Sequence, residues 1–155
     1  MSWSRSNPTT GPKILLMPDE VSYAKLEFGE EQFQLLRREL GVTSFGLNLV
    51  TLRPRQRGRI HRHERQEEVY LVLEGELTLV FEDEERTLAK GELARVGPEL
   101  RRQIVNRSDA PTVLLAIGGS GEHQGRDGRA WGSWEEGGEG RPPQEVPQPE
   151  DLPVQ

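Results

Sequence analysis

Between residues 44 and 118 the chain consists of short strand-like segments separated by turn residues, and this spacing restricts its fold more than any other feature. Residues 44–52 are rich in β-forming residues, and in residues 77–82 Leu77, Leu79 and Phe81 alternate with less apolar positions. Similar segments follow as "ERTLA", "GELARVG", "RRQIVN" and "PTVLLAIGG". Many short strands with little helix between them predict an all-β sandwich or barrel. A length of 155 residues suits one such domain.

One segment near the N-terminus is ambiguous. In "EEQFQLLRREL", residues 30–40, the side chains of Phe33, Leu36 and Leu40 would share one face of a helix that ends at Gly41. Read at every second position, the same segment also permits a strand. The pattern alone favours the helix.

Composition limits the partners and the cellular compartment. The net charge is −6, and the segment 118–155, with eight acidic and three basic residues, accounts for −5 of it. Because no basic surface is indicated, we expect no nucleic-acid partner. There is no cysteine, so thiolate metal sites and thiol nucleophiles are excluded. No apolar run approaches the roughly 20 residues of a membrane span, and the N-terminus lacks an apolar signal-like stretch, so we expect a cytoplasmic protein without a membrane partner.

The two ends of the chain differ in composition from its centre. We predict a flexible N-terminus over residues 1–12, a β-barrel domain over residues 13–122, and a C-terminal tail over residues 123–155. The tail is rich in Gly, Pro and Glu and is predicted to be mostly disordered, because it has little apolar surface to bury. Trp131 and Trp134 are expected to attach the start of this tail to the outside of the barrel.

Two of the three histidines stand one residue apart, just before a pair of glutamates. In an extended segment His61 and His63 point to the same side, and Glu68 shares its face with Tyr70, whereas Glu67 points away. If these strands lie side by side with those faces inward, two imidazoles and one carboxylate converge. Such a set suits divalent iron, manganese, nickel or zinc and leaves coordination positions open. The alternative is a set of polar residues that binds nothing.

The order of these residues, His-x-His-x4-Glu-x6-Gly, resembles the first sequence motif of the cupin superfamily. The segment "GELARVGPELRRQIVN" is similar to the second motif of that superfamily. The resemblance covers residues 44–118 and implies a small single-domain cupin of the type-2 conserved-barrel kind, with a double-stranded β-helix (jelly-roll) fold. It also implies that residues 34–50 form a pair of strands. The matching positions are His61, His63, Glu68 and Gly75 in the first motif, and Gly91 and Asn106 in the second.

Three positions depart from the cupin pattern. Arg55 stands where the first motif usually opens with glycine, and "GPE" at residues 97–99 replaces the usual Pro-x-Gly. Arg102 stands where the second motif usually has a histidine, which in cupins is the fourth metal ligand. Arginine cannot coordinate a cation and repels one at short range. If the register were shifted by one residue, Gln103 would offer an amide oxygen in its place.

The sequence therefore predicts a metal-dependent cupin that binds or transforms a small polar or anionic metabolite, with dioxygenase or isomerase chemistry. The resemblance implies that the metal ligands are His61, His63 and Glu68. We expect Arg102, Tyr70 and Gln103 to contact the ligand, since a guanidinium group suits a carboxylate or a phosphate. The alternative is a metal-free binding or sensor protein in which Glu68 pairs with Arg102 in the cavity. The sequence does not decide whether the protein is an enzyme.

The strand that carries Glu68 also has an apolar outer face. Val69, Leu71 and Leu73 alternate with the inward residues and must be covered by other groups. Apolar strand faces on a barrel exterior usually mark an interface, and cupins commonly pair in this way. We therefore expect a homodimer.

Overall fold

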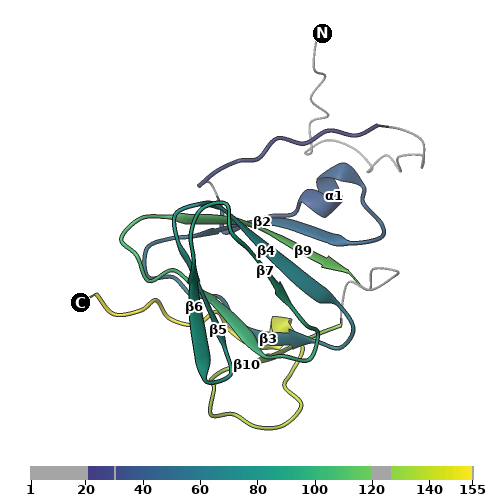
Figure 1. The fold of residues 1–155 in the computed structure, drawn as a ribbon. Helices are drawn as coiled ribbons and strands as arrows, with labels where there is room; N and C mark the ends of the chain where they lie inside the picture. The colour runs from purple at the N-terminus through teal and green to yellow at the C-terminus, as the bar shows by residue number, and fades with distance from the viewer. Residues whose placement is uncertain (1–20, 30, 120–126, 155) are drawn as a thin grey trace.

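The computed structural model describes residues 21–29, 31–119 and 127–154, so the predicted flexible segment 1–12 lies outside the described residues. Two antiparallel five-stranded sheets face each other (Figure 1), which confirms the prediction of an all-β jelly-roll barrel. The first sheet has the order β1 (Phe33–Gln34), β2 (Gly46–Leu52), β9 (Thr112–Gly119), β4 (Glu67–Glu74) and β7 (Leu93–Val96). The second has the order β10 (Gly128–Trp131), β3 (Ile60–His63), β8 (Arg102–Val105), β5 (Leu77–Phe81) and β6 (Glu84–Leu88).

The described residues contain one short α-helix, α1 (Leu36–Leu40), and one 3-10 helix, η1 (Pro143–Glu145). Neither of them is long and apolar enough to cross a lipid bilayer.

The core lies between the two sheets and is formed by the inward side chains of alternating strand residues. On β4, Tyr70 and Val72 are 2% and 0% exposed and belong to this core. Glu68 occupies the same face, one step nearer the end of the barrel, where its cross-strand neighbours are Gly118 and Val96. The other buried members of the core are Val50, Leu52, Leu77, Leu79, Leu88, Val96, Ile104 and Leu114. The apolar core thus fills the middle of the barrel and leaves the polar residues at one end.

Two positions of the first cupin-like motif have left-handed backbone conformations. Gly75 follows β4 with φ 76°, and a Cβ built there would lie 2.4 Å from the carbonyl oxygen of Pro111. Only glycine fits such a position. Arg55 has φ 68°, which explains why glycine is usual at that position of the motif. Its guanidinium group contacts the carbonyl oxygen of Arg107 and the carboxylate of Asp109, and these contacts help to hold an unfavourable backbone conformation.

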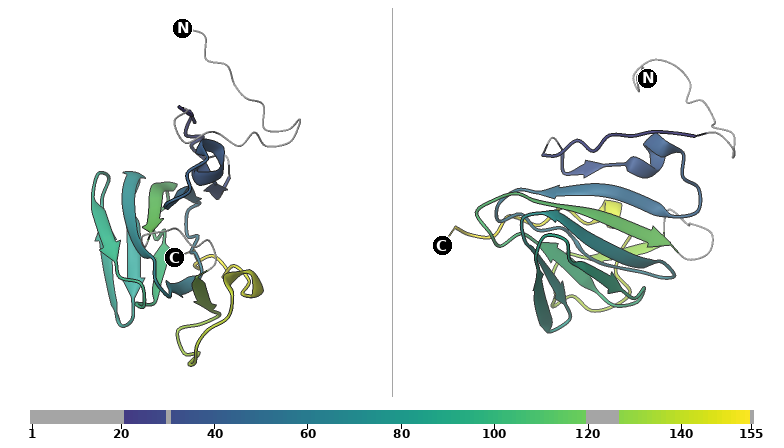
Figure 2. Two further views of the ribbon diagram at one scale, coloured as in Figure 1. Left: turned by 90° about the vertical axis from the view of Figure 1, so that its right-hand side faces the viewer. Right: turned by 45° about the horizontal axis from the view of Figure 1, so that its top comes forward.

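The segment before β2 contains the short helix α1. The prediction of a strand pair over residues 34–50, which came from the resemblance, is wrong for residues 36–40, where α1 forms. The helix ends at Gly41, whose φ of 72° is typical of a C-terminal cap. Leu36 is 3% exposed and packs with Leu49 and Val113 on the outer face of the first sheet. In Figure 2 the dark-blue segment with α1 lies over this sheet. The prediction of a helix ending at Gly41, made from the apolar pattern, is therefore confirmed for residues 36–40.

Within residues 127–154 the structure places the chain against the barrel, which does not fit the prediction that the tail over residues 123–155 is mostly disordered; residues 123–126 and 155 lie outside the described residues. Strand β10 extends the second sheet by pairing with β3, beyond the predicted domain end at residue 122. Val146 is 1% exposed, and its carbonyl oxygen accepts a hydrogen bond of 2.7 Å from the Arg59 side chain. The backbone N–H of Leu152 donates to the carbonyl oxygen of Arg55 at 2.7 Å. The composition of the tail suggested disorder, because a local composition cannot reveal contacts with partners that lie far away in the sequence.

The two tryptophans do attach this segment to the outside of the barrel, as predicted. Trp131 is 3% exposed, and the indole N–H of Trp134 donates to the side-chain oxygen of Gln103 at 3.3 Å. The guanidinium group of Arg101 lies 5.4 Å and 5.2 Å from the ring centres of Trp131 and Trp134. These cation–π contacts join the C-terminal segment to the start of β8.

Val146 provides a test of this packing. We expect Val146→Ala to lower the free energy of unfolding by about 1–2 kcal/mol, because it leaves a cavity under the C-terminal segment. Val154→Ala, the same change at a residue that is 85% exposed, is the control and should change it by less than about 0.5 kcal/mol. Chemical denaturation of the three proteins measures the difference. Equal stability of the two variants would show that the segment does not contribute to the core.

Candidate metal centre

The three predicted metal ligands converge at one end of the barrel. His61 and His63 project from β3, and Glu68 projects from β4 in the opposite sheet. The Nε2 atoms of His61 and His63 lie 3.0 Å and 2.9 Å from the same oxygen, Oε1 of Glu68. One ligand atom from each residue lies within 4.8 Å of the others. Their side chains are 21%, 18% and 13% exposed, so solvent reaches the group. The structure therefore contains a candidate His-His-Glu metal site.

Hydrogen bonds on the far side of each ring determine the tautomers. Nδ1 of His61 lies 3.1 Å from the carbonyl oxygen of Arg59, which can only accept a hydrogen bond. Nδ1 of His63 lies 2.8 Å from Oδ1 of Asp127, a carboxylate that also acts as an acceptor. From this network we assign the ring proton to Nδ1 in both histidines. In the neutral rings, both Nε2 lone pairs then point toward Glu68.

Three electron-rich atoms in one place require positive charge between them. Two lone pairs directed at an ionised carboxylate oxygen repel it unless each ring gains a second proton or a cation lies among the three ligands. Two imidazole nitrogens and one carboxylate oxygen form a suitable donor set for iron, manganese, nickel or zinc. Acceptors on the outer ring nitrogens are the arrangement usual for metal-binding histidines. The residues present therefore fit a divalent metal ion.

Arg102 lies directly beside this group, inside the barrel as predicted. Its side chain is 0% exposed, and its NH2 lies 3.2 Å from Oε1 of Glu68. NH1 donates to the carbonyl oxygens of Pro98 and Leu100, at 3.0 Å and 2.6 Å. Nε and NH2 make no hydrogen bond of good geometry within the described part of the chain. The site thus contains a fixed positive charge whose NH2 group is paired with Glu68 and whose Nε is a buried donor without a hydrogen bond in the described part of the chain.

Glu68 and Tyr70 have opposite pKa shifts. Burial alone would raise the pKa of Glu68, but the hydrogen bonds and charges that His61 and His63 supply when their rings are protonated outweigh burial and hold it well below its ordinary value. The hydroxyl of Tyr70 donates to Oε1 of Glu68 at 3.1 Å. Burial, together with the charge of Glu68, raises the pKa of Tyr70 well above its ordinary value. Glu68 is therefore an ionised acceptor, and Tyr70 remains a neutral donor that orients it.

Asp127 is a member of the site that the sequence did not reveal. Its Oδ2 accepts hydrogen bonds from the backbone N–H groups of Arg65 and Gln66, at 3.0 Å and 2.9 Å, and its Oδ1 faces His63. Although burial opposes ionisation, these backbone bonds and His63 lower the pKa of Asp127. In the sequence it is one acidic residue in a Gly-rich segment. The strand-like residues 129–131 that follow it were the only local signal.

Gln103 lies outside the site, so its predicted contact with a ligand or metal is wrong. It follows Arg102 on the same strand and therefore points to the opposite face of the sheet. Its side-chain nitrogen donates to the carbonyl oxygen of Gly58 at 2.9 Å, and its oxygen accepts from Trp134. The shifted register considered for the second motif does not occur.

Comparison with known proteins agrees with the fold. The sequence model of the cupin domain matches residues 48–118. A sugar phosphate isomerase from a cupin superfamily, from Silicibacter pomeroyi, has 30% identity and a TM-score of 0.57, and the alignment covers 64% of each chain. A proposed sugar phosphate isomerase from Acidithiobacillus ferrooxidans has 25% identity and a TM-score of 0.55, with 61% of this chain and 60% of the other covered. A cupin protein from Bacteroides fragilis has 25% identity and a TM-score of 0.56, with 63% and 84% covered.

Residues 48–118 therefore match the cupin domain, and the fold is that of structures described as cupin proteins. The chain matches less than two thirds of the length of the two proteins described as isomerases. No curated protein matches the sequence significantly.

The pKa shifts predict how pH affects the metal-free protein. Burial lowers the pKa of His63, but the hydrogen bond and charge of Glu68 outweigh burial and raise it above its ordinary value of 6.5. The resulting stability is fully present below pH 6.5 and is lost as pH rises through the raised pKa. The contribution of Glu68, whose pKa is lowered from 4.5, is present above pH 4.5 and is lost as pH falls through the lowered pKa.

In the presence of a chelator, we therefore expect the free energy of unfolding to be larger at about pH 6 than at about pH 8.5. His63→Gln should reduce this difference, and urea denaturation at the two pH values measures it. A wild-type protein that becomes more stable between these two values would contradict the expected role of His63.

Proposed function

We propose that this protein is a metal-dependent cupin whose divalent ion, of iron, manganese, nickel or zinc, is held by His61, His63 and Glu68. The observation that carries the proposal is that the Nδ1 atoms of both histidines face hydrogen-bond acceptors, the carbonyl oxygen of Arg59 and the carboxylate of Asp127. This arrangement directs the Nε2 lone pairs of His61 and His63 toward one oxygen of Glu68. A divalent cation among these atoms would relieve their repulsion. Without it, both imidazole rings would have to take up a second proton while largely buried.

We further propose that the ligand is a small polar or anionic metabolite of the sugar phosphate class, and that the chemistry is of the isomerase type. Two structural neighbours with 30% and 25% identity are described as sugar phosphate isomerases, which favours isomerase over dioxygenase chemistry. A bound metal would supply a Lewis acid that polarises a carbonyl oxygen. Three protein ligands leave room for the adjacent carbonyl and hydroxyl oxygens of a sugar.

The residues around the metal ligands have complementary roles in this proposal. Arg102 carries a buried positive charge, and its Nε makes no hydrogen bond among the described residues, so its guanidinium group is suited to bind an anionic group of the ligand. Tyr70 keeps its proton and holds Glu68 in the orientation needed for coordination. Neither role requires Gln103.

A second candidate function is a metal-free binding or sensor protein. The distance of 3.2 Å between Arg102 and Glu68, together with complete burial of the arginine side chain, favours it. In that case Arg102 would neutralise Glu68 in place of a metal, and the ligand would bind to the resulting polar group. The two candidates differ in whether the purified protein contains a metal.

Metal content and metal affinity test the first candidate. We expect protein purified without a histidine tag or a chelator to contain nearly one metal ion per chain by elemental analysis. Glu68→Gln should weaken metal binding by more than the roughly 10–100-fold that loss of an outer-shell partner costs. Glu67→Gln is the matched control, because the adjacent Glu67 is exposed and pairs with Arg95. Equal affinity of the two variants would show that Glu68 is not a ligand.

The isomerase proposal has its own test. NMR spectra of a set of aldose and ketose phosphates, each mixed with metal-loaded protein, should show interconversion of at least one pair. The Glu68→Gln variant should abolish this conversion and Glu67→Gln should not. If no metal binds after anaerobic reconstitution with iron, manganese, nickel and zinc, the metal-free function is supported instead.

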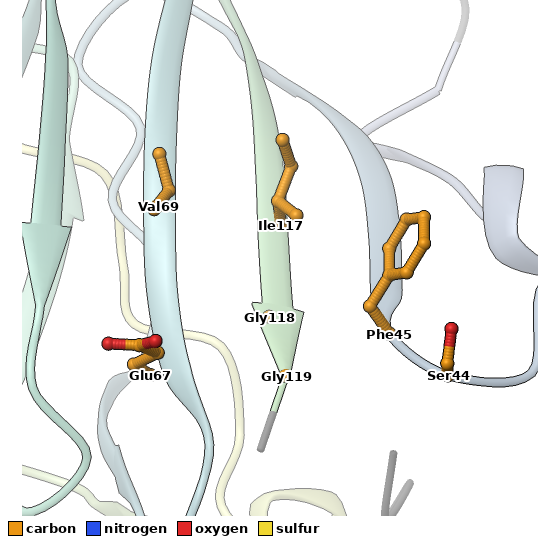
Figure 3. A pocket seen from close by; sticks show the side chains of 7 residues that line it. All are labelled: Ser44, Phe45, Glu67, Val69, Ile117, Gly118 and Gly119. Carbon is orange, nitrogen blue, oxygen red and sulfur yellow. The ribbon is translucent and has the colours of Figure 1, made fainter. Parts of the chain in front are cut away.

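We also propose that the protein forms a cytoplasmic homodimer and has neither nucleic acid nor a membrane as a partner. On the outer face of the first sheet, Figure 3 shows Val69 and Ile117 on neighbouring strands, with Phe45 beside them. These residues line a shallow pocket of about 290 Å³. Phe45 is 38% exposed, and Leu93 on the edge strand β7 is 61% exposed. A second copy of this face would cover these apolar groups.

Light scattering at micromolar concentration tests the dimer. We expect the wild-type protein to have the mass of two chains and Val69→Lys to have the mass of one, because a charge would be buried in the interface. Thr87→Lys, on the exposed strand β6 of the other sheet, is the control and should remain dimeric. A wild-type mass of one chain would contradict the proposal.

A further inference from the structure

We propose that Asp127 positions His63 for metal binding and thereby links the metal centre to the C-terminal strand β10. This inference rests on the proposed metal-dependent function. It adds a residue from outside the cupin-like motifs, because Asp127 lies beyond the matched segment 48–118.

The carboxylate of Asp127 is held firmly on both of its oxygens. Oδ2 accepts the backbone N–H groups of Arg65 and Gln66, at 3.0 Å and 2.9 Å. Oδ1 accepts the side-chain N–H of Gln66 and lies 2.8 Å from Nδ1 of His63. The side chain of Asp127 is only 6% exposed. A carboxylate fixed in this way holds the ring of His63 in one orientation and one tautomer, and it increases the basicity of Nε2.

The two metal-binding histidines are thus supported in different ways. The acceptor for His61 is the carbonyl oxygen of Arg59, two residues away in the sequence. The acceptor for His63 comes from a residue 64 positions away. The orientation of His61 is therefore determined near β3 itself, whereas the orientation of His63 requires the C-terminal segment to be docked.

Docking of β10 places Asp127 at the site. Gly128 is the cross-strand neighbour of His63, and Ala130 is that of His61. A Cβ built on Gly128 would lie 3.7 Å from Cε1 of His63 and 3.2 Å from Cγ of Pro143, so the strand packs closely at this point. By thermodynamic linkage, metal binding should stabilise the docked β10 by the same factor by which docking strengthens metal binding.

Asp127→Asn separates the positioning role from a purely structural one. The amide oxygen of asparagine can still accept the backbone N–H groups of Arg65 and Gln66, which preserves the loop. Its NH2 group, however, would face Nδ1 of His63 and act as a donor. The ring proton would then move to Nε2, where it blocks coordination. Loss of the correct tautomer with the geometry retained is a known consequence of this substitution beside a functional histidine.

Calorimetric titration with Mn²⁺ and with Zn²⁺ tests the inference. We expect Asp127→Asn to weaken binding of both ions by about 10–100-fold. Asp151→Asn, the same chemical change at an exposed residue of the same segment, should leave the affinity unchanged. In the metal-free proteins, at an alkaline pH where the imidazole is neutral, ¹⁵N chemical shifts should place the proton of His63 on Nδ1 in the wild type and on Nε2 in Asp127→Asn. Wild-type affinity together with an unchanged tautomer would overturn the inference.

Hydrogen exchange provides a readout that needs no variant. Saturation of the wild-type protein with Zn²⁺ should slow exchange of the β10 amides at residues 129–131 more than that of the β6 amides, and equal effects would overturn the linkage. If the wild type binds neither Mn²⁺ nor Zn²⁺, the proposed function fails together with the inference. If the wild type binds and Asp127→Asn binds equally well, only the inference fails.

Discussion

The carboxylate oxygen Oε1 of Glu68 is the point on which the rest of the site depends. The side chains of His61, His63, Tyr70 and Arg102 all reach this atom, at 2.9–3.2 Å. They come from β3, β4 and β8, so both sheets must be in register before the group can form. A largely buried carboxylate is costly unless it is paired. The charge of Arg102, the hydroxyl of Tyr70 and either protonated histidines or a bound cation keep it ionised at one end of an apolar core.

A second layer of contacts decides what this cluster can bind. The Arg59 carbonyl and Asp127 take the outer nitrogens of the two histidines, which leaves the inner nitrogens as acceptors. Without this layer, the rings could adopt the opposite tautomer and simply donate to Glu68. Acceptors behind the ligands therefore turn a hydrogen-bonded cluster into a site suited to a cation.

Arg102 limits the strength of such a site while adding a function to it. Its positive charge lies 3.2 Å from the ligand oxygen and opposes a divalent ion. Its guanidinium group also has a buried Nε donor that makes no hydrogen bond among the described residues, and a histidine at this position would not offer the same planar set of donors. In the proposed function, an arginine in place of the usual fourth ligand would weaken metal binding and would offer a contact to an anionic group, in keeping with sugar phosphates as the proposed ligand class.

Local patterns in the sequence were sufficient for the all-β class and for the shared face of His61 and His63, because strand alternation assigns each side chain to a face. Their convergence with Glu68 needed the two sheets to face each other. Strand alternation also places Gln103 on the outside once Arg102 is inside. The packing of residues 127–154 against the barrel and the contact of Asp127 with His63 became visible in the tertiary structure alone. The contact of Asp127 with His63 joins positions 64 residues apart, and no local pattern of apolar or polar residues records such a contact.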